Sequence, residues 1–312
     1  MCATYCRPDQ LAEIRHATDI AGYVTEKASL ETGLHTCTKV LVGTGDSGAE
    51  AVSTGVFRSG DVMIQMGSSC YFICLCDHPV NEPRMWPGTF IIPGTYALCA
   101  GTNTAGTLTR WFRDEIFGDF SEAEHDGGVN AYEKMAAAAE KVPAGSNGLV
   151  CLPYFAGERT PINVPFAKGV FFGLTLSHTR AHLYKAALEG IGYTIARHFD
   201  IYEEDSISVN KIMAVGGGTK NRIWLQVIAD ILGRPVCTAK VTFGASYGDA
   251  IMAALSGGAY KDWDELAKVI EPDLVIQPDM QAHEIYNLQR HVFDELYERN
   301  MDLMHELYEK VR

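Results

Sequence analysis

The sequence predicts an α/β protein with at least one mixed sheet covered by helices. An opening αβα order is followed by an antiparallel, strand-rich stretch and then by alternating strands and helices. Of the 312 residues, 47% are hydrophobic, which is enough to drive burial and excludes disorder over most of the chain. No stretch approaches the ~20 apolar residues of a membrane span. The start, Met1–Gln10, is polar, so we expect no secretory leader.

The chain is acidic, with a formal net charge of −13. A nucleic-acid binder needs a basic face to displace phosphate counterions, so that class is excluded. A phosphorylated ligand stays compatible, because backbone amides hold phosphate without Lys or Arg. The nine cysteines are an odd number in a fairly large chain, unlike a small secreted disulfide framework. We therefore predict a reducing, cytoplasmic location.

Caps and periodicity define the elements of the first half. A helix is predicted over 26–32, with Thr25 as its N-cap and Gly33 as its end. The apolar run KVLVG, residues 39–43, predicts a buried strand, and a glycine-rich turn leads from it into a short helix. Two strands over 61–76 predict a hairpin. Strand-like runs at 90–101 and helices at 106–118 and 130–141 follow.

Strands and helices alternate in the second half. Apolar residues recur every four positions within 178–202, which is the clearest helix signal in the chain. A strand that ends in GGGTKN precedes a helix that Gly233 ends. The amphipathic stretch 282–312 predicts a terminal helix that either lies on the body of the domain or binds a partner, and we favour the first. The other predicted elements are strand, long loop and strand over 149–174, a strand over 234–241 and a helix over 244–258.

Cys70, Cys74 and Cys76, followed by His78, raise the question of a metal site. They fall in the strand-like run CYFICLC, in which alternate side chains share one face. Zinc sites usually use C-x2-C pairs on turns. We predict buried or half-buried structural thiols here and assign no metal ligands.

Three glycine-rich turns each follow a predicted strand, at 43–48, 66–69 and 216–221. Together they predict a cleft lined by backbone, which is how α/β sheets build nucleotide sites. The first turn spells G-x-G-x-x-G, the pattern of a dinucleotide site. That pattern needs an acidic residue at the end of the second strand, whereas Asp61 begins one. A dinucleotide-binding oxidoreductase is therefore the distant alternative.

Asp46 lies in the first turn, after a predicted strand and near a helix N-terminus, where a carboxylate is favoured as an anion. One interpretation is that Asp46 caps its own helix. The other is that Asp46 is a general base aimed into a cleft.

The stretch GVFFGLTLSHTRAHLYKAALEG resembles the second signature of the FGGY family of carbohydrate kinases. The residues at positions that this signature requires are Gly169, Gly173, Leu174, His182, Leu183, Ala186 and Glu189. Further motifs are similar to those of the family and occur in the family's order along the chain. They are the GxGD turn, the G-[ST]-S hairpin, the loop LPYFAGERTPINVPFAKG before the signature, and GGGTKN with WLQVIADILGRPV. The resemblance covers about Leu11 to Gly258 and leans toward xylulokinase-like and gluconokinase-like members.

This resemblance implies an actin/hexokinase-like (ribonuclease H-like) ATPase lobe with a mixed sheet flanked by helices. It also implies ATP-dependent phosphorylation of a sugar or polyol hydroxyl. Family members are longer and have two lobes, and the opening D-x-G-[ST] phosphate loop has no match here. We expect residues 1–56 to be the tail of the N-terminal, sugar-binding lobe and residues 57–312 to be the C-terminal, ATP-binding lobe.

The chain is then a truncated product, a product with a mispredicted start, or half of a split enzyme. Its partners would be a sugar or polyol, and a separate N-terminal half or a second copy. The alternative is a non-catalytic ATP-binding lobe. Removal of the first lobe should expose the apolar side of Val40, Leu41 and Val42.

The resemblance also implies residue roles. Asp46 matches the catalytic base that takes the proton from the sugar hydroxyl, and Ser47 stands where relatives often carry a substrate-contacting Asn or Gln. ATP would come with Mg²⁺, whose main anchor is expected in the absent lobe. The implied nucleotide contacts are Gly67 and Ser68 in the hairpin, Gly106 and Arg110 after it, and Gly217, Gly218 and Asn221 in the last turn. Glu158 and Arg159 in GERTP form either a lobe-interface ion pair or a solvated loop, and we favour a structural role.

Overall fold

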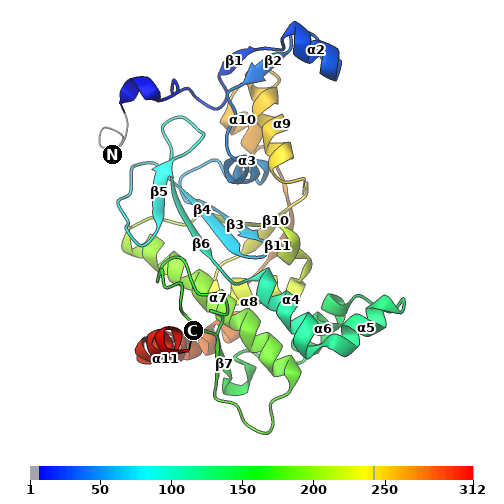
Figure 1. Cartoon of the computed structure of the whole chain (residues 1–312), viewed down its shortest axis with the longest axis vertical. Helices are drawn as coiled ribbons and strands as arrows, with labels where there is room; N and C mark the ends of the chain where they lie inside the picture. The colour runs from blue at the N-terminus through cyan, green and yellow to red at the C-terminus, as the bar shows by residue number, and fades with distance from the viewer. Residues whose placement is uncertain (1–6, 242, 312) are drawn as a thin grey trace.

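The computed structural model of the chain describes residues 7–241 and 243–311, and it centres on a seven-stranded mixed sheet (Figure 1). The strand order is β11-β10-β9-β3-β4-β6-β5. Strand β9 runs parallel to both β3 and β10, whereas the other neighbours are antiparallel, so the predicted mixed sheet is confirmed. Its strands are β3 (Asp61–Met66), β4 (Cys70–Cys76), β5 (Trp86–Thr89), β6 (Tyr96–Thr102), β9 (Lys211–Val215), β10 (Val236–Ala239) and β11 (Pro272–Ile276).

Two smaller antiparallel sheets and a set of helices complete the fold. The first small sheet pairs β1 (Ile20–Tyr23) with β2 (Lys39–Leu41), and the second pairs β7 (Val150–Leu152) with β8 (Val170–Phe172). The α-helices are α2 (Glu26–Thr32), α3 (Asp46–Ser53), α4 (Gly106–Trp111), α5 (Gly118–His125), α6 (Ala131–Glu140), α7 (Arg180–Glu204), α8 (Arg222–Leu232), α9 (Ala245–Ser256), α10 (Trp263–Ala267) and α11 (Met280–Lys310). A π-helical turn, Phe112–Ile116, extends α4.

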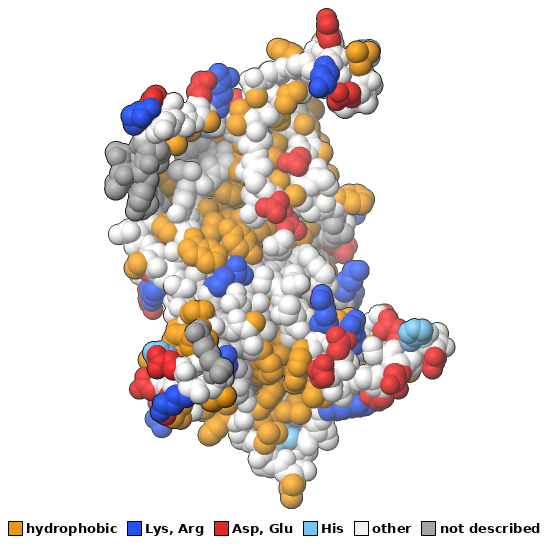
Figure 2. Space-filling model, viewed as in Figure 1, with side chains coloured by type: hydrophobic (Ala, Val, Ile, Leu, Met, Phe, Trp, Pro, Cys, Tyr) orange, Lys and Arg blue, Asp and Glu red, His pale blue; other side chains and the backbone are white. Residues whose placement is uncertain are grey.

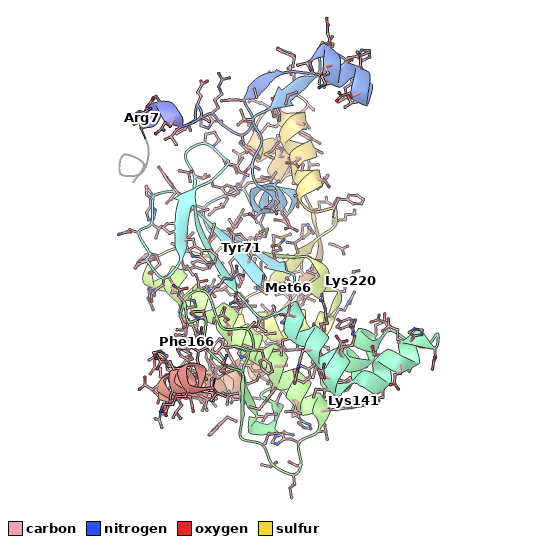
Figure 3. The ribbon with its side chains drawn as sticks, viewed as in Figure 1. Arg7, Met66, Tyr71, Lys141, Phe166 and Lys220 are labelled. Carbon is pink, nitrogen blue, oxygen red and sulfur yellow. The ribbon has the colours of Figure 1, made fainter. Side chains whose placement is uncertain are left out.

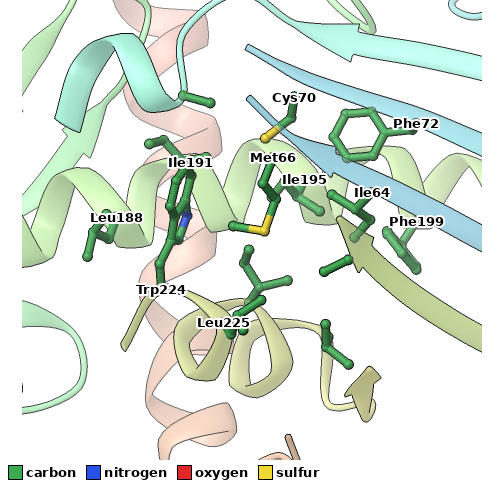
Figure 4. Packing of buried hydrophobic residues seen from close by; sticks show 14 of the residues in the cluster. Ile64, Met66, Cys70, Phe72, Leu188, Ile191, Ile195, Phe199, Trp224 and Leu225 are labelled. Carbon is green, nitrogen blue, oxygen red and sulfur yellow. The ribbon is translucent and has the colours of Figure 1, made fainter. Parts of the chain in front are cut away.

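Alternate side chains of β3 face opposite layers, as strand geometry requires. Ile64 and Met66 face α7 and α8, where they pack with Ile191 and Trp224 in the largest buried cluster (Figure 4). Met63 faces the other layer and packs in a separate cluster near α3. Cys70, Cys74 and Cys76 are buried free thiols of β4, as predicted. The sheet is therefore covered on both faces, with α7 and α8 on one side and α3 and α9 on the other.

The first small sheet and α2 project from the body at one end of the molecule (Figure 1). The predicted strand at KVLVG is confirmed as β2, but the prediction that it is buried is wrong, since Val40 is 44% and Val42 41% exposed. Leu41, between them, is half-buried and packs against a cluster that includes Ala49 and Val52 of α3. The expected exposure of Val40 and Val42 is therefore confirmed, whereas that of Leu41 is wrong.

Helix α3, by contrast, packs tightly against the body. Ala49 and Val52 are fully buried, and Gly248 on α9 lies so close that a Cβ there would be 1.8 Å from the carbonyl oxygen of Ala49. Helix α3 is therefore already part of the body, although it lies before the predicted boundary after residue 56, and Ala17 is buried in the same cluster. That boundary stays a prediction.

The dinucleotide alternative is wrong on topology. The turn at 43–48 follows β2, which pairs antiparallel with β1 and is not part of the seven-stranded sheet. A dinucleotide site needs that turn between a strand and a helix of one parallel sheet. Asp61 instead accepts backbone hydrogen bonds from Phe57 and Arg58, both at 3.1 Å, and stabilises the start of β3.

Helix α11 lies at the end of the molecule opposite α2 (Figure 1). The predicted placement on the body is confirmed: Tyr286, Phe293 and Tyr297 are buried against α7, α8 and β7. Leu288 and Leu303, expected on the packed side, are exposed instead. No described helix is both long and apolar enough to cross a bilayer.

Candidate active site

The hairpin between β3 and β4 meets the start of α4 through backbone hydrogen bonds. The Gly106 N–H donates to the carbonyl of Gly67 and the Thr107 N–H donates to the carbonyl of Ser68, both at 3.0 Å. The Thr107 hydroxyl also donates to the Ser68 carbonyl at 3.0 Å. A Cβ on Gly106 would lie 2.4 Å from the Gly67 oxygen, so glycine is required for this approach. Gly67 and Ser68 are exposed at the tip, which leaves the Ser68 hydroxyl available to a ligand.

The third glycine turn lies against the same hairpin. Gly216, with a φ of +92°, and Gly218 both abut Met66: a Cβ on Gly218 would be 2.7 Å from the Cβ of Met66. Gly217 lies between them, is exposed, and has open space where a Cβ would be. Figure 3 shows Met66 at the edge of the sheet with Lys220 of the same turn nearby. The structure thus brings together the predicted residues Gly67, Ser68, Gly106, Gly217 and Gly218.

Asp46 is the first residue of α3, and Glu50 of the same helix contacts the strand that leads into this hairpin. The Asp46 side chain is exposed, and its Oδ1 accepts a hydrogen bond from the Ser47 N–H at 2.8 Å. The N-cap of α3 is Gly45. One turn later, Glu50 accepts a hydrogen bond from the Gln65 amide of β3, next to Met66. Burial, and then the Asp46 charge, raise the pKa of Glu50. Asp46 and Glu50 are four residues apart and therefore share one face of α3, and Glu50 joins this face to the end of β3.

Ser47 borders a cavity of about 510 Å³ between the chain before α3 and the sheet. Tyr71 of β4 lines the same cavity. Burial raises the pKa of Tyr71, so that this phenol stays protonated. The Tyr71 ring stacks on Trp86, at 6.3 Å between centroids, and the Arg159 guanidinium lies 5.7 Å from the Trp86 centroid. An aromatic wall beside Ser47 was not foreseen, because Tyr71 and Trp86 come from separate strands.

Two predicted nucleotide contacts have different surroundings from the rest. The Asn221 side chain is occupied: its Oδ1 accepts from the Trp224 N–H at 3.2 Å, and its Nδ2 donates to the Tyr184 hydroxyl at 3.1 Å. It is the N-cap of α8, so any adenine contact would add to a structural role. Arg110 lies one turn into α4, exposed, with no ion pair or hydrogen bond to the residues that the structure describes. Both assignments stay predictions.

Glu158 and Arg159 are structural, and not a solvated loop. Glu158 is buried, and its Oε1 accepts from the backbone N–H groups of Asn103 and Arg159, each at 2.7 Å. Burial raises the pKa of Glu158 to about 7. The Arg159 guanidinium donates to the Thr102 carbonyl at 2.8 Å. These contacts tie the GERTP loop to the end of β6, directly before the turn into α4.

Two residues near the hairpin were missed by the sequence reasoning. Thr107 fixes the Ser68 carbonyl, and Lys220 is an exposed cation in the GGGTKN turn. A hydroxyl and an amine are common at solvent-facing turns, so neither carried a signal before the hairpin was placed beside them. Within residues 7–241 and 243–311, no group of three or more His, Cys, Asp or Glu side chains could hold a metal ion.

Comparison with known proteins gives a consistent result. Residues 62–257 match the sequence profile of the FGGY family of carbohydrate kinases, C-terminal domain. The chain is 29% identical over 289 residues to the xylulose kinase of Staphylococcus epidermidis. That alignment covers 92% of this chain and 56% of that protein. The chain is 27% identical over 265 residues to the gluconokinase of Bacillus subtilis, with 84% and 52% covered. Its fold superposes on the crystal structure of xylulose kinase from Rhodospirillum rubrum with a TM-score of 0.86 and 32% identity, over 96% of this chain and 59% of that one.

The chain therefore spans little more than half the length of these relatives. The profile that matches is that of a C-terminal domain, and it begins at the second residue of β3. The hairpin, α4 and the GGGTKN turn all lie inside the matched range, whereas Asp46 and Ser47 lie before it.

Proposed function

Since this chain belongs to the FGGY family of carbohydrate kinases, we propose that it supplies the ATP-binding half and the catalytic base of an enzyme that phosphorylates a sugar or polyol hydroxyl. The observation that carries the proposal is that the β3–β4 hairpin, the start of α4 and the GGGTKN turn meet around Met66–Ser68, with α3, whose first residue is Asp46, joined to β3 through Glu50. Xylulose and gluconate, the substrates in the names of its relatives, indicate the substrate class.

The ATP site of this proposal is built mainly from backbone. Gly67 and Gly217 are exposed and carry no side chain, so phosphates and base can approach the main chain closely. The Ser68 hydroxyl and the Lys220 amine supply a donor and a positive charge near the phosphates. This composition explains how a chain with a net charge of −13 can hold a polyanion.

Asp46 acts as general base in the proposed reaction. Its carboxylate is exposed and its Oδ1 is held by the Ser47 N–H, so its Oδ2 is available to accept the proton of an acceptor hydroxyl. Phosphoryl transfer needs little covalent assistance, and alignment of the acceptor oxygen with the donor supplies most of the rate. Ser47, Tyr71 and Trp86 form the wall of this half against which the acceptor would lie.

Mg²⁺ would neutralise charge on the ATP phosphates. It would accompany the nucleotide, with its main protein anchor in the N-terminal half, and we assign it no ligand in this chain. We place the enzyme in the cytoplasm, because the cysteines that the structure describes, such as Cys70 and Cys151, are free thiols. Free thiols are typical of a reducing compartment.

The second wall of the site would come from an N-terminal half. The exposed apolar side of β2, including Val40 and Val42, supports a covering partner there. The alternative function is that of a non-catalytic ATP-binding lobe. The effect of an Asp46 substitution on sugar turnover distinguishes a catalytic lobe from a non-catalytic one.

The test is Asp46→Asn in this chain combined with its N-terminal half. The turnover number for the sugar should fall at least ~10²-fold, the usual scale for loss of a general base. ATP affinity should change little, because Asp46 faces the acceptor. Asp126→Asn, an exposed carboxylate at the end of α5, is the matched control and should leave turnover unchanged. Near-normal turnover in Asp46→Asn would remove this residue from the mechanism.

A further inference from the structure

The GERTP loop holds the turn that leads from β6 into α4. The backbone N–H of Asn103, in that turn, donates to Glu158 Oε1 at 2.7 Å, and the side-chain amide of Asn103 donates to the Ala156 carbonyl at 3.1 Å. The Arg159 guanidinium donates to the carbonyl of the preceding residue, Thr102, at 2.8 Å. Two consecutive residues of the turn are therefore fixed by the loop and the residue before it.

The same turn is also bonded to the hairpin between β3 and β4. The Ala105 N–H donates to the Ser68 carbonyl at 3.2 Å. The N–H of Cys70, the first residue of β4, donates to the Thr102 hydroxyl at 3.3 Å. Burial, and then the Glu158 charge, raise the pKa of the Cys70 thiol. The turn therefore connects Glu158 to the hairpin, and the charge of Glu158 acts on the first residue after it.

Glu158 is a buried carboxyl whose two oxygens differ in their surroundings. The residue is 2% exposed. Its Oε1 accepts from the N–H groups of Asn103 and Arg159, whereas its Oε2 is buried and has no hydrogen-bond partner among the residues that the structure describes. An ionised carboxylate is unfavourable in such a place, and burial raises the pKa of Glu158 to about 7.

The charged groups around Glu158 do not offset this burial. The guanidinium groups of Arg159 and Arg197 lower the pKa of Glu158, but by less than burial raises it. Arg197 of α7 is also paired with Asp294 of α11, at 2.7 Å. The other ionisable groups that face this carboxyl are neutral: the Cys70 thiol of β4, the Tyr154 phenol after β7, and His198 of α7, whose pKa burial lowers to about 4.

Arg159, the next residue, connects the same loop to the proposed acceptor wall. Its guanidinium lies 5.7 Å from the centroid of Trp86, which stacks on Tyr71. Figure 2 shows hydrophobic side chains gathered over the sheet at the place where Figure 3, in the same view, labels Tyr71. A shift of the loop would therefore disturb the nucleotide turn and the acceptor wall together.

We propose that Glu158 is a positioning residue of the nucleotide site: it fixes the turn next to the hairpin, and it takes up a proton when a nucleoside triphosphate binds there. Glu158 has this role only if the proposed function holds, since Gly67 and Ser68 are taken as phosphate contacts. Bound phosphates add negative charge near a buried carboxylate, and a like charge favours the neutral form. A neutral carboxyl keeps its carbonyl oxygen as an acceptor, so the turn stays fixed while the repulsion is removed.

The experiment is titration calorimetry of MgATP with the full chain in buffers of different ionisation enthalpy, which counts the protons taken up on binding. The pKa of Glu158 is about 7 without ligand, and bound phosphates should raise it by about 1. The native chain should then take up about 0.4 of a proton at pH 7, and its affinity should fall about tenfold from pH 6 to pH 9. The affinity is highest at low pH because the neutral carboxyl does not repel the phosphates.

Two substitutions separate the position of the turn from the proton. Glu158→Gln keeps an acceptor for the Asn103 N–H but cannot gain a proton, so it should bind MgATP without this uptake and with a flat pH profile. Glu158→Ala removes the acceptor and should weaken binding about tenfold at pH 6, where the native carboxyl is neutral. The matched control is Glu189→Gln. Glu189 is also buried with a pKa of about 7, but its partners are Ser146 and Tyr286, so the uptake should stay.

The outcomes distinguish this role from the proposed function. If MgATP binds and Glu158→Gln keeps the proton uptake and the pH profile of the native chain, the role of Glu158 is refuted and the proposed function stands. Loss of the uptake in Glu189→Gln but not in Glu158→Gln would refute it as well. If the native chain binds no MgATP at any pH, the proposed function fails, and the role of Glu158 fails with it.

Discussion

Gly106 is the position at which the proposed ATP site is most sensitive to one added methyl group. In Gly106→Ala the Cβ would lie 2.4 Å from the Gly67 oxygen, whereas ordinary contact begins at 3.4 Å. The start of α4 and the hairpin would have to separate by about 1 Å, the difference between those distances. That separation stretches the hydrogen bonds from Gly106 and Thr107 to the hairpin, both 3.0 Å long at present.

The expected cost follows from these contacts. Overpacking of this kind costs about 1–3 kcal/mol. Each weakened hydrogen bond adds up to about 1 kcal/mol. The melting temperature should fall on the order of 5–10 °C, measured by calorimetry. Because the carbonyl of Ser68 moves together with its hydroxyl, ATP affinity should fall at least tenfold in titration calorimetry.

Two other glycines serve as controls for this substitution. A Cβ on Gly217 or on Gly118 would meet nothing within 4 Å, so both alanine variants should keep the melting temperature. Gly217→Ala should still weaken ATP binding, because its methyl group would occupy the proposed site. Gly118→Ala should change neither quantity. If Gly106→Ala retained both its melting temperature and its ATP affinity, the assignment of the hairpin and α4 to the nucleotide would be refuted.

The remaining predictions concern two polar side chains of α7 and α8. Asn221→Ala should weaken ATP binding in titration calorimetry by about 1 kcal/mol, the value of one net hydrogen bond. It should also destabilise the fold by a similar amount, because the N-cap of α8 is lost. Tighter binding of NAD than of ATP in the same titration would contradict the assignment. Burial raises the pKa of Glu189 to about 7 from an ordinary 4.5, so the folded state holds the proton more tightly than the unfolded chain. This carboxyl therefore destabilises the fold increasingly from about pH 4.5 to about pH 7, by up to about 3 kcal/mol. Glu189→Gln should flatten that part of the urea-unfolding pH profile, and an unchanged slope would show that the carboxyl is not the cause.

Local signals in the sequence were enough to place most elements. Thr25 and Gly33 bound α2 as predicted, since a cap depends on the residue itself and on backbone within one turn. The hairpin of β3 and β4 followed from alternation around a glycine turn. Short edge elements such as β1 and β11 were not predicted, because four or five half-exposed residues carry little periodicity.

Properties that depend on distant partners were less predictable. An apolar run such as that around Val40 has the same pattern whether or not something covers it, so its exposure could not be read from periodicity alone. Of the apolar row expected to pack α11 on the body, Leu296 is buried and most of the others are exposed, because aromatic residues such as Tyr286 and Phe293 fill the space beneath the helix. For the site, the glycines assigned from the family resemblance lie close together around Met66, and their role in nucleotide binding stays a prediction. The engagement of Asn221 with Tyr184 was not foreseen, since Tyr184 lies on another helix.

We propose that this chain holds ATP and the catalytic base and that a separate N-terminal half supplies the other wall of the cleft. The most direct test measures ATP binding and sugar-stimulated ADP release on the same sample of the 312-residue chain, with a panel of pentoses, polyols and gluconate. We predict that ATP binds, and that no sugar raises ADP release above background, because no second wall aligns the acceptor hydroxyl or excludes water. Robust sugar-stimulated turnover by this chain alone, or no binding of ATP at all, would contradict the account.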